Sequence, residues 1–348
     1  MQSINLHDLT TTLTTLVLLA LGSLVVSVII TPLYTYFAYR YRFWKRQRVT
    51  STSGEALTVF TKLHEKKFER NIPTMAGIII VLAVTFITIS ANLDRQQTWL
   101  PLAALLGGAL VGAIDDIINI RGRSLGVAGL RSGLKFVMIT AVAVLGAWFF
   151  YYKLGFHSIH VPFVAGQWEI GWLVMPLFVL AVVSAGNAVN ISDGLDGLAG
   201  GLCASAFTFY AAIALLQGNE GIAGFCFTIL GALLSYLWFN VYPARFFMGD
   251  IGSFALGTAL GVVAMLTNSI LLLPVIGAMF VIEVGSSALQ LISKRLLHRR
   301  VFLSAPIHHH LEAIGWPETK VTMRFWLVAN VTGFVGFLIA LAGGHIGV

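Results

Sequence analysis

The stretch of residues 170–196, IGWLVMPLFVLAVVSAGNAVNISDGLD, joins an apolar segment directly to a row of polar side chains. The polar side chains recur every third residue, at Asn187, Asn190, Asp193 and Asp196. Residues three apart share one face of a helix, so we expect two amides and two carboxylates to line one strip. Because such a strip is costly against lipid, we interpret it as the lining of a polar site.

The composition of the whole chain is that of a membrane protein. Of its 348 residues, 57% are hydrophobic and only 11% are charged, and the mean hydropathy is +0.85. This leaves too little charge for an ordinary soluble surface. No Lys or Arg precedes the first apolar run, so the basic region of a cleavable signal peptide is missing. We therefore predict an all-α integral membrane protein.

Ten apolar segments have about the length that a bilayer core requires. They cover residues 13–33, 73–91, 98–114, 134–152, 170–187, 198–216, 221–240, 252–267, 269–291 and 325–344. We interpret them as ten transmembrane helices of a single polytopic domain, because no second soluble domain, internal repeat or low-complexity segment is apparent.

The connections between these segments alternate in charge. One set holds 20 of the 22 Lys and Arg residues, and the other set holds only Arg95 and Lys153. The basic set comprises residues 34–72, 115–135, 188–197, 241–251 and 292–324. By the positive-inside rule these connections are cytoplasmic, which places both termini outside and the polar strip on the cytoplasmic face.

Other features of the chain have simple structural interpretations. The basic and aromatic residues 40–48 are expected to contact anionic lipid headgroups, and no recognition fold supports nucleic-acid binding. Cys203 and Cys226 match no metal-ligand spacing, so we expect small buried side chains. The external residues 153–169 could form a small hairpin at the outer interface.

Carboxylates gather in the connections that are predicted to be cytoplasmic. Asp115 and Asp116 end the third segment, and Asp250 lies in the motif MGDIGS of residues 248–253. Alone, the Asp pair could be a solvated helix end, and the motif could be a glycine turn with a helix cap. Together with Asp193 and Asp196 they suggest a cation site, and oxygen ligands near Lys and Arg fit Mg²⁺ holding a phosphate.

Two further polar groups have open interpretations. His308, His309 and His310 could bind metal or phosphate or form a solvated loop, and we favour contact of one or two of them with phosphate or substrate. Glu283 lies seven residues before Gln290 and shares its helix face, so we favour hydrogen bonding between helices over catalysis. The glycines after Asp193 could admit a ligand or allow close helix packing.

Taken together, these motifs resemble those of the polyprenyl-phosphate N-acetylhexosamine-1-phosphate transferases. The resemblance covers Asp115-Asp116, residues 187–201, residues 239–253 and the segment APIHHHLE of residues 305–312 with Trp316 and residues 324–326. The triple-histidine segment is similar to that of the branch that acts on muramoyl-pentapeptide. The resemblance implies a cytoplasmic active site on ten transmembrane helices, and a homodimer in the bacterial inner membrane.

The resemblance also implies a reaction and a set of roles. Phospho-MurNAc-pentapeptide would pass from UDP-MurNAc-pentapeptide to undecaprenyl phosphate, giving lipid I and UMP with Mg²⁺. Asp250 would be the metal ligand, Asp115 and Asp116 would handle the acceptor phosphate, and Lys135 would match a family lysine. The nucleotide sugar would be contacted by the remaining site residues: Asn187, Asn190, Asp193, Asp196, His309 and His310.

The chain departs from the family pattern close to this site. Residues 69–72 read Glu-Arg-Asn-Ile where the family usually has Lys-x-Gly-Thr, Ala76 replaces a glycine, and Asn119 replaces a lysine. The connection to Lys135 is also two residues longer. Arg70 is our candidate for the missing substrate-binding charge, with Lys66 and Lys67 as alternatives.

Two other functions compete with this interpretation. A related transferase could use UDP-GlcNAc or another UDP-HexNAc, although the triple histidine argues against it. From a different class, intramembrane carboxylates could belong to a cation-coupled transporter. The acids here crowd one face, and no paired broken-helix pattern is visible in the two halves of the sequence.

Overall fold

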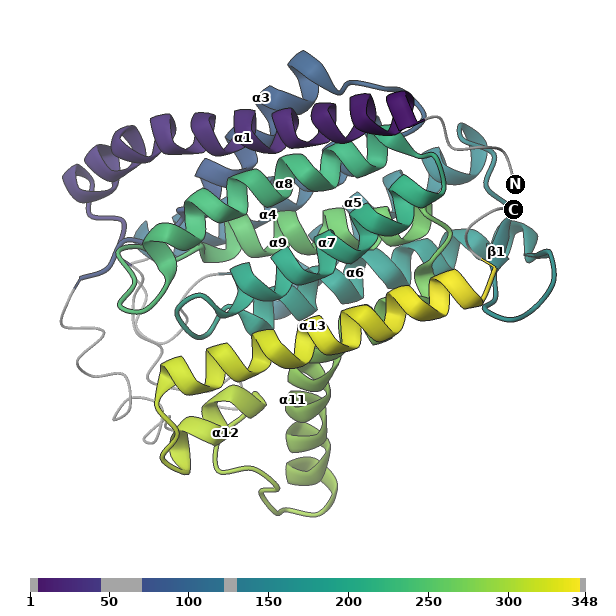
Figure 1. Cartoon of the computed structure of the whole chain (residues 1–348). Coiled ribbons are helices and arrows are strands. Elements are labelled where there is room, and N and C mark those ends of the chain that lie inside the picture. The colour runs from purple at the N-terminus through teal and green to yellow at the C-terminus, as the bar shows by residue number, and fades with distance from the viewer. Residues whose placement is uncertain (1–5, 45–70, 122–129, 345–348) are drawn as a thin grey trace.

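The computed structural model describes residues 6–44, 71–121 and 130–344, which form a bundle of long helices (Figure 1). The bundle consists of α1 (Leu6–Arg40), α3 (Gly77–Ala91), α4 (Trp99–Arg121), α5 (Ser132–Tyr152), α6 (Val174–Ser192), α7 (Leu198–Leu216), α8 (Glu220–Asn240), α9 (Gly249–Leu266) and α13 (Glu318–Ala342). Short helices η1 (Gly171–Leu173), η2 (Ile270–Leu272), α10 (Leu273–Ile276) and α12 (Ile307–Ala313) and the longer α11 (Ala278–Leu296) complete the helical part. The all-α membrane prediction is confirmed.

Every one of the ten predicted segments contains a helix, but their lengths differ. In the described part of the chain, eight helices are long and apolar enough to cross a membrane. Helix α3 has only 15 residues, and residues 270–296 form two helical pieces bent by 79°. The start of α1 and the end of α13 lie at the same end of the bundle (Figure 1). This arrangement is the one expected of an even number of crossings.

Helix α9 is the centre of the bundle, and every residue from Gly249 to Leu266 is buried. It packs against α3, α4, α6 and α7. Glycines permit this close contact, because a Cβ on Gly252 would lie 2.7 Å from Cα of Gly77, and one on Gly257 would lie 2.5 Å from the Ala185 carbonyl oxygen. Small residues at crossings are the usual means of packing helices in lipid, where apolar burial alone gives no driving force.

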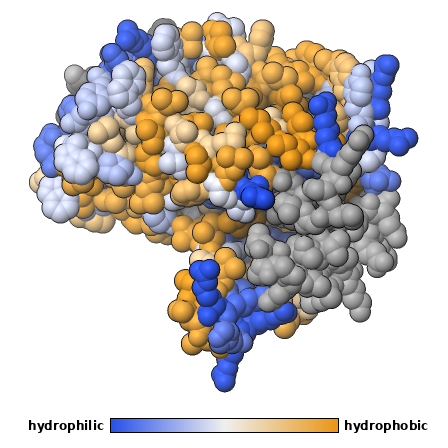
Figure 2. All heavy atoms as spheres, turned by 180° about the vertical axis from the view of Figure 1, so that it is seen from behind, coloured by the Kyte–Doolittle hydropathy of each residue, from blue (hydrophilic) through white to orange (hydrophobic). Residues whose placement is uncertain are grey.

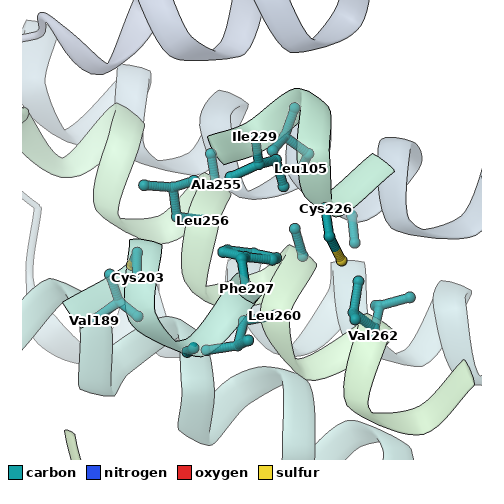
Figure 3. Close-up of a cluster of buried hydrophobic side chains, with 14 of the residues drawn as sticks. Leu105, Val189, Cys203, Phe207, Cys226, Ile229, Ala255, Leu256, Leu260 and Val262 are labelled. Carbon is teal, nitrogen blue, oxygen red and sulfur yellow. The ribbon is translucent and has the colours of Figure 1, made fainter. Parts of the chain in front are cut away.

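Large side chains fill the space between these crossings. Figure 3 shows Leu105 of α4, Phe207 of α7 and Leu256 and Leu260 of α9 meeting in one buried cluster. Cys203 and Cys226 belong to the same region and are fully buried and free. Their interpretation as small buried side chains is confirmed.

The outer faces of the bundle are apolar. On α1, exposed residues include Leu18 and Ile29, whereas Ser23 and Ser27 are buried. Apolar residues cover the middle of the face seen in Figure 2, and polar residues lie toward its ends. An apolar exterior with buried hydroxyls is the reverse of a soluble protein and fits a chain surrounded by lipid.

A small hairpin follows α5, as predicted. Strand β1 (Ser158–His160) pairs antiparallel with β2 (Gln167–Glu169). The backbone N–H of His160 donates to Oδ1 of Asn268 at 2.9 Å. This bond ties the hairpin to the end of α9, far along the bundle from Asp250 at the start of that helix.

The predicted span of residues 269–291 is wrong as a single helix, because the chain turns sharply at Gly277 between α10 and α11. Helix α11 leaves the bundle at a steep angle (Figure 1). Its polar residues Glu283, Ser286, Gln290 and Ser293 are buried, and its apolar residues Ile282, Leu289, Ile292 and Leu296 are exposed. Their spacing of three and four residues places the polar side chains on one face.

The buried polar face of α11 binds the segment that follows it. Gln290 donates to the Phe302 carbonyl at 2.9 Å and accepts from the N–H groups of Val301 and Phe302. Ser293 donates to the Arg299 carbonyl at 2.9 Å. Helix α11 is therefore amphipathic with its polar side turned inward, which leaves an apolar side for lipid.

Candidate active site

Lys135 joins two carboxylates from different helices. Its Nζ lies 2.7 Å from Oδ2 of Asp115 on α4 and 2.7 Å from Oδ2 of Asp250 on α9. The other oxygen of Asp115 accepts the Leu130 N–H at 2.6 Å. The structure thus brings together three of the predicted site residues from three separate helices, and their catalytic roles stay a prediction.

Asp116 lies beside this cluster, at the first turn of α9. Its Oδ2 accepts the N–H of Ile251 at 3.1 Å, and the residue is 1% exposed. The first N–H groups of a helix have no partner within the helix, and the positive end of the helix dipole favours anions. Asp116 therefore stabilises the start of α9, and Asp250 lies in the same turn.

Gly249 is required where α9 begins. Its φ is +75°, and a Cβ there would lie 2.6 Å from Oδ2 of Asp116 and 2.8 Å from the backbone nitrogen of Met75. The segment before α3 runs alongside, because Ala76 N–H donates to Phe247 O at 3.0 Å and Phe247 N–H to Pro73 O at 2.8 Å. The Pro-Thr-Met segment thus forms one wall of the carboxylate cluster.

Several predicted boundaries of connections are corrected by the structure. Asp115 and Asp116 lie inside α4, which continues to Arg121, rather than after a helix that ends at residue 114. Lys135 and Asp250 each lie in the first turn of a helix rather than in a loop. The polar side chains extend the helices beyond their apolar parts, which hydropathy alone cannot detect.

The polar strip at residues 187–196 is not one helix face, and this prediction was wrong. Helix α6 ends at Ser192, and Asp193 (φ −81°, ψ 53°) has left the helical conformation. Asp196 lies in the turn between α6 and α7, before Gly197 with φ +77°. Gly194 lets His308 approach, because a Cβ at this position would lie 2.3 Å from its Nε2.

Asp196 anchors this turn on three sides. Its Oδ2 accepts the Ala244 N–H at 3.0 Å, and its own N–H donates to Oε1 of Glu318 at 2.6 Å. Thr322 donates its hydroxyl to the Asp196 carbonyl at 3.2 Å. Asn240 accepts the Gly197 N–H at 3.0 Å. The turn of residues 193–197, called the donor turn below, is thereby fixed to α8, α13 and the α8–α9 connection.

The two asparagines of the strip remain on α6. Asn190 donates to Oγ of Ser253 at 2.9 Å, which places it one turn from Asp250 on α9. Asn187 donates to the Val183 carbonyl of its own helix at 2.8 Å. Asn190 is therefore held toward the carboxylate cluster, and its contact with a nucleotide sugar stays a prediction, as it does for Asn187, Asp193 and Asp196.

The three histidines have different partners. Nδ1 of His308 lies 2.6 Å from Oε2 of Glu283, and both side chains are fully buried. Nδ1 of His309 lies 2.8 Å from Oε2 of Glu312, whereas Nδ1 of His310 accepts the Leu303 N–H at 3.2 Å. Only part of the triplet can therefore face a common ligand, which agrees with the divergence expected on a helix.

A polar cavity of about 550 Å³ lies at the opposite end of the bundle. Gln97, Gln217 and Asn268 are among its lining residues, and none of the lining residues is acidic. It lacks the carboxylates needed for cation chemistry. We therefore place the candidate active site at the carboxylate cluster.

Comparison with known proteins shows the family of the chain. Residues 98–268 match the model of glycosyl transferase family 4, a range that contains Asp115, Lys135 and Asp250. The phospho-N-acetylmuramoyl-pentapeptide-transferase of Chloroflexus aurantiacus is 38% identical over 94% of this chain and 90% of its own length. The enzymes of that name from Geobacillus thermodenitrificans and Clostridium kluyveri are 38% and 39% identical over 91% and 80% of this chain and 95% and 87% of theirs.

The chain belongs to the phospho-N-acetylmuramoyl-pentapeptide-transferase family. Membership of this family agrees with the resemblance of the sequence motifs, and it favours a transferase over the cation-coupled transporter. The positions at which this chain differs from the usual family pattern include Asn119 and residues 69–72. Asn119 is buried on α4 one turn after Asp115, whereas Arg70, Lys66 and Lys67 lie outside the described residues.

Three residues of this family member were missed as site residues. Ser253 contacts Asn190, and Glu318 contacts the donor turn. His308 contacts Glu283. Glu283 itself was expected to hydrogen-bond between helices, and it does so with His308 of α12. The position of Ser253 three residues after Asp250, on one helix face, was a signal that could have identified it. Nothing local marks Glu318.

The carboxylate cluster is chemically suited to Mg²⁺. Within the described ranges no group of three or more His, Cys, Asp and Glu side chains is arranged to hold a metal ion. Mg²⁺ does not need such a group, since it commonly takes one or two carboxylates together with substrate phosphates. Asp115 and Asp250 bring carboxylate oxygens from two helices to one place, and oxygen is the ligand atom that Mg²⁺ prefers.

Proposed function

We propose that this protein transfers phospho-MurNAc-pentapeptide from UDP-MurNAc-pentapeptide to undecaprenyl phosphate, releasing lipid I and UMP in peptidoglycan synthesis. The observation that carries the proposal is the Asp115–Lys135–Asp250 cluster in a chain 38% identical to bacterial transferases of that name over nearly its full length. The chain is a multi-pass membrane protein, and we place it in the bacterial inner membrane with the cluster on the cytoplasmic side.

The reaction requires that anions be brought together. An oxygen of the acceptor phosphate attacks the sugar-linked phosphorus of the donor, and the bond from that phosphorus to the UMP oxygen breaks. A phosphate monoester is largely ionised near neutral pH, so positioning and charge compensation contribute more than a strong base. Among the residues that the structure describes, Lys135 supplies a positive charge at the cluster. The first turn of α9 adds the positive end of a helix dipole.

Asp250 would hold a Mg²⁺ ion together with the substrate phosphates, and Asp115 is the next carboxylate oxygen in reach. When bound, the ion would supply charge stabilisation for the phosphates and the leaving UMP. Asp115 and Asp116 are assigned to the acceptor phosphate. Lys135 binds both Asp115 and Asp250, so it positions the two carboxylates whether the donor or the acceptor phosphate binds first.

The donor is assigned to the surfaces around the cluster. Asn187, Asn190, Asp193 and Asp196 are our candidates for contact with the nucleotide sugar, and His309 and His310 for contact with its phosphates. Arg70 remains a candidate for the substrate-binding charge. A homodimer is part of the same proposal.

The test is an assay of UMP release by purified protein with Mg²⁺ and undecaprenyl phosphate. UDP-MurNAc-pentapeptide and UDP-GlcNAc are offered separately, and the lipid product is identified by mass. We expect UMP and lipid I from the first donor only. Release from UDP-GlcNAc alone would replace the donor in the proposal, and absence of UMP with either donor would refute the transfer.

A further inference from the structure

Glu283 and His308 form a buried pair that the reaction described above does not use. Oε2 of Glu283 on α11 lies 2.6 Å from Nδ1 of His308 on α12, and both side chains have 0% exposure. Nδ1 of His308 therefore hydrogen-bonds to this carboxyl group, and Nε2 lies on the opposite side of the ring. Burying an acid is costly unless a specific partner compensates, so this contact strongly favours one orientation of the ring.

The far side of the His308 ring lies against the donor turn. A Cβ at Gly194 would lie 2.3 Å from Nε2 and 2.9 Å from Cε1 of His308. These distances leave no room for any side chain larger than hydrogen at residue 194. The imidazole therefore fits closely between Glu283 and the backbone of the turn, and a change in its orientation would alter the support of that turn.

Other contacts hold the same turn from different sides. Glu318 and Thr322 of α13 bind Asp196, and Trp326 donates to the Gly197 carbonyl at 3.2 Å. These contacts fix its C-terminal half. His308 is the large side chain packed against Gly194, next to Asp193, where α6 has already ended. The pair with Glu283 thus supports the N-terminal half of the turn, where the Asp193 N–H donates to the Asn190 carbonyl at 3.3 Å.

We propose that Glu283 is a positioning residue, which acts through His308 to hold the donor turn in the conformation that binds the nucleotide sugar. This inference rests on the proposed function. Glu283 does not touch the reacting atoms in this account. Its effect is on donor binding, so it is expected in the KM for the nucleotide sugar and not in the KM for the lipid acceptor.

The experiment compares Glu283→Ala, Glu283→Gln and Gly194→Ala in purified full-length protein, with KM measured separately for UDP-MurNAc-pentapeptide and undecaprenyl phosphate. We expect Glu283→Ala to raise the donor KM about tenfold, as for loss of one strong buried hydrogen bond. Glu283→Gln keeps an acceptor oxygen of the same shape and should stay within about threefold of wild type. Gly194→Ala should also raise the donor KM, because its methyl group displaces the ring.

Ser293→Ala is the matched control, since it removes one hydrogen bond between the same α11 face and the following segment, ten residues further along. It should leave both KM values unchanged. Equal rises in both KM values for Glu283→Ala, or a Gln variant as impaired as the Ala variant, would overturn the positioning role. If wild type releases no UMP, the proposed function fails instead. Should Glu283→Ala not fold, the Gln and Gly194 variants still decide the matter.

Discussion

Lys135 has two carboxylate partners and is largely buried, with 13% of its side chain exposed. Removing its charge would take away the cation that Asp115 and Asp250 share and increase the repulsion between the two carboxylates. We expect Lys135→Met to lower the rate of UMP release by about 100- to 1,000-fold, the scale of losing one preorganised electrostatic group. Lys153→Met is the control, because Lys153 lies over Trp148 on α5 near the opposite end. A Lys135 variant with wild-type turnover would exclude the lysine from the site.

The site residues differ in how far the sequence could identify them. Asp115, Asp116 and Asp250 were recognisable because carboxylate clusters coincide on one predicted face of the protein, whereas Lys135 was identified through the family resemblance. Asp193 and Asp196 were recognisable as polar residues, but their period of three wrongly suggested a continuous helix. The helix ends at Ser192, and Gly194 then accommodates His308, a contact across more than a hundred residues that no local pattern contains.

At the level of helices, the crossing of α4 and α9 determines the position of the carboxylates. A Cβ on Gly112 would lie 2.1 Å from the carbonyl oxygen of Asp250. Because that atom belongs to the backbone, Gly112→Ala must separate the two helices. We expect a loss of about 1–3 kcal/mol of stability, as for overpacking, and a larger loss of activity, measured by thermal unfolding in detergent and by UMP release.

Gly133 on α5 is the control for this substitution. Within the described residues no atom lies within 4 Å of a Cβ built there, and the residue is exposed. Gly133→Ala should be neutral or add up to about 1 kcal/mol through helix propensity. Equal effects of the two substitutions would show that the α4–α9 contact does not position the cluster.

Helix α11 is predicted to lie with its apolar side in lipid. Cys203 and Cys226 are buried, so a cysteine introduced at Leu289 can carry a fluorophore selectively. We expect brominated lipids to quench a probe at Leu289→Cys and aqueous iodide to leave it unaffected. A probe at Gln167→Cys on the exposed strand β2 should respond to iodide. Quenching of both probes by iodide alone would place α11 in water.

The sequence predicted the helical segments well because each long apolar run has few alternatives to a helix in lipid. It could not predict the bend at Gly277, since residues 269–291 have the length and hydropathy of a span. The signal that was present is the polar period at Glu283, Ser286, Gln290 and Ser293. In sequence this period indicates a buried face, and only the fold shows that the partner is the segment at residues 299–308.

For the whole molecule, the charge asymmetry predicts which end of the bundle faces the cytoplasm. Gln96 and Arg299 are exposed and belong to connections assigned to opposite sides. In intact cells we expect a membrane-impermeant maleimide to label Gln96→Cys, whereas Arg299→Cys should react only after permeabilisation. Labelling of both residues from the outside would contradict the orientation and the number of crossings.

Asp250 is the central residue of the proposed site, because it belongs to the carboxylate cluster, lies at the start of α9 and is the proposed metal ligand. The decisive measurement is UMP release from UDP-MurNAc-pentapeptide as a function of Mg²⁺ concentration for wild type, Asp250→Asn and the control Asp94→Asn. Asp94 accepts the N–H groups of Gln96 and Gln97 far from the cluster, and asparagine can replace it in both bonds. We predict Mg²⁺-dependent release by wild type and Asp94→Asn, and loss of release by Asp250→Asn at every concentration. Near-normal turnover of Asp250→Asn at low Mg²⁺ would contradict the assignment.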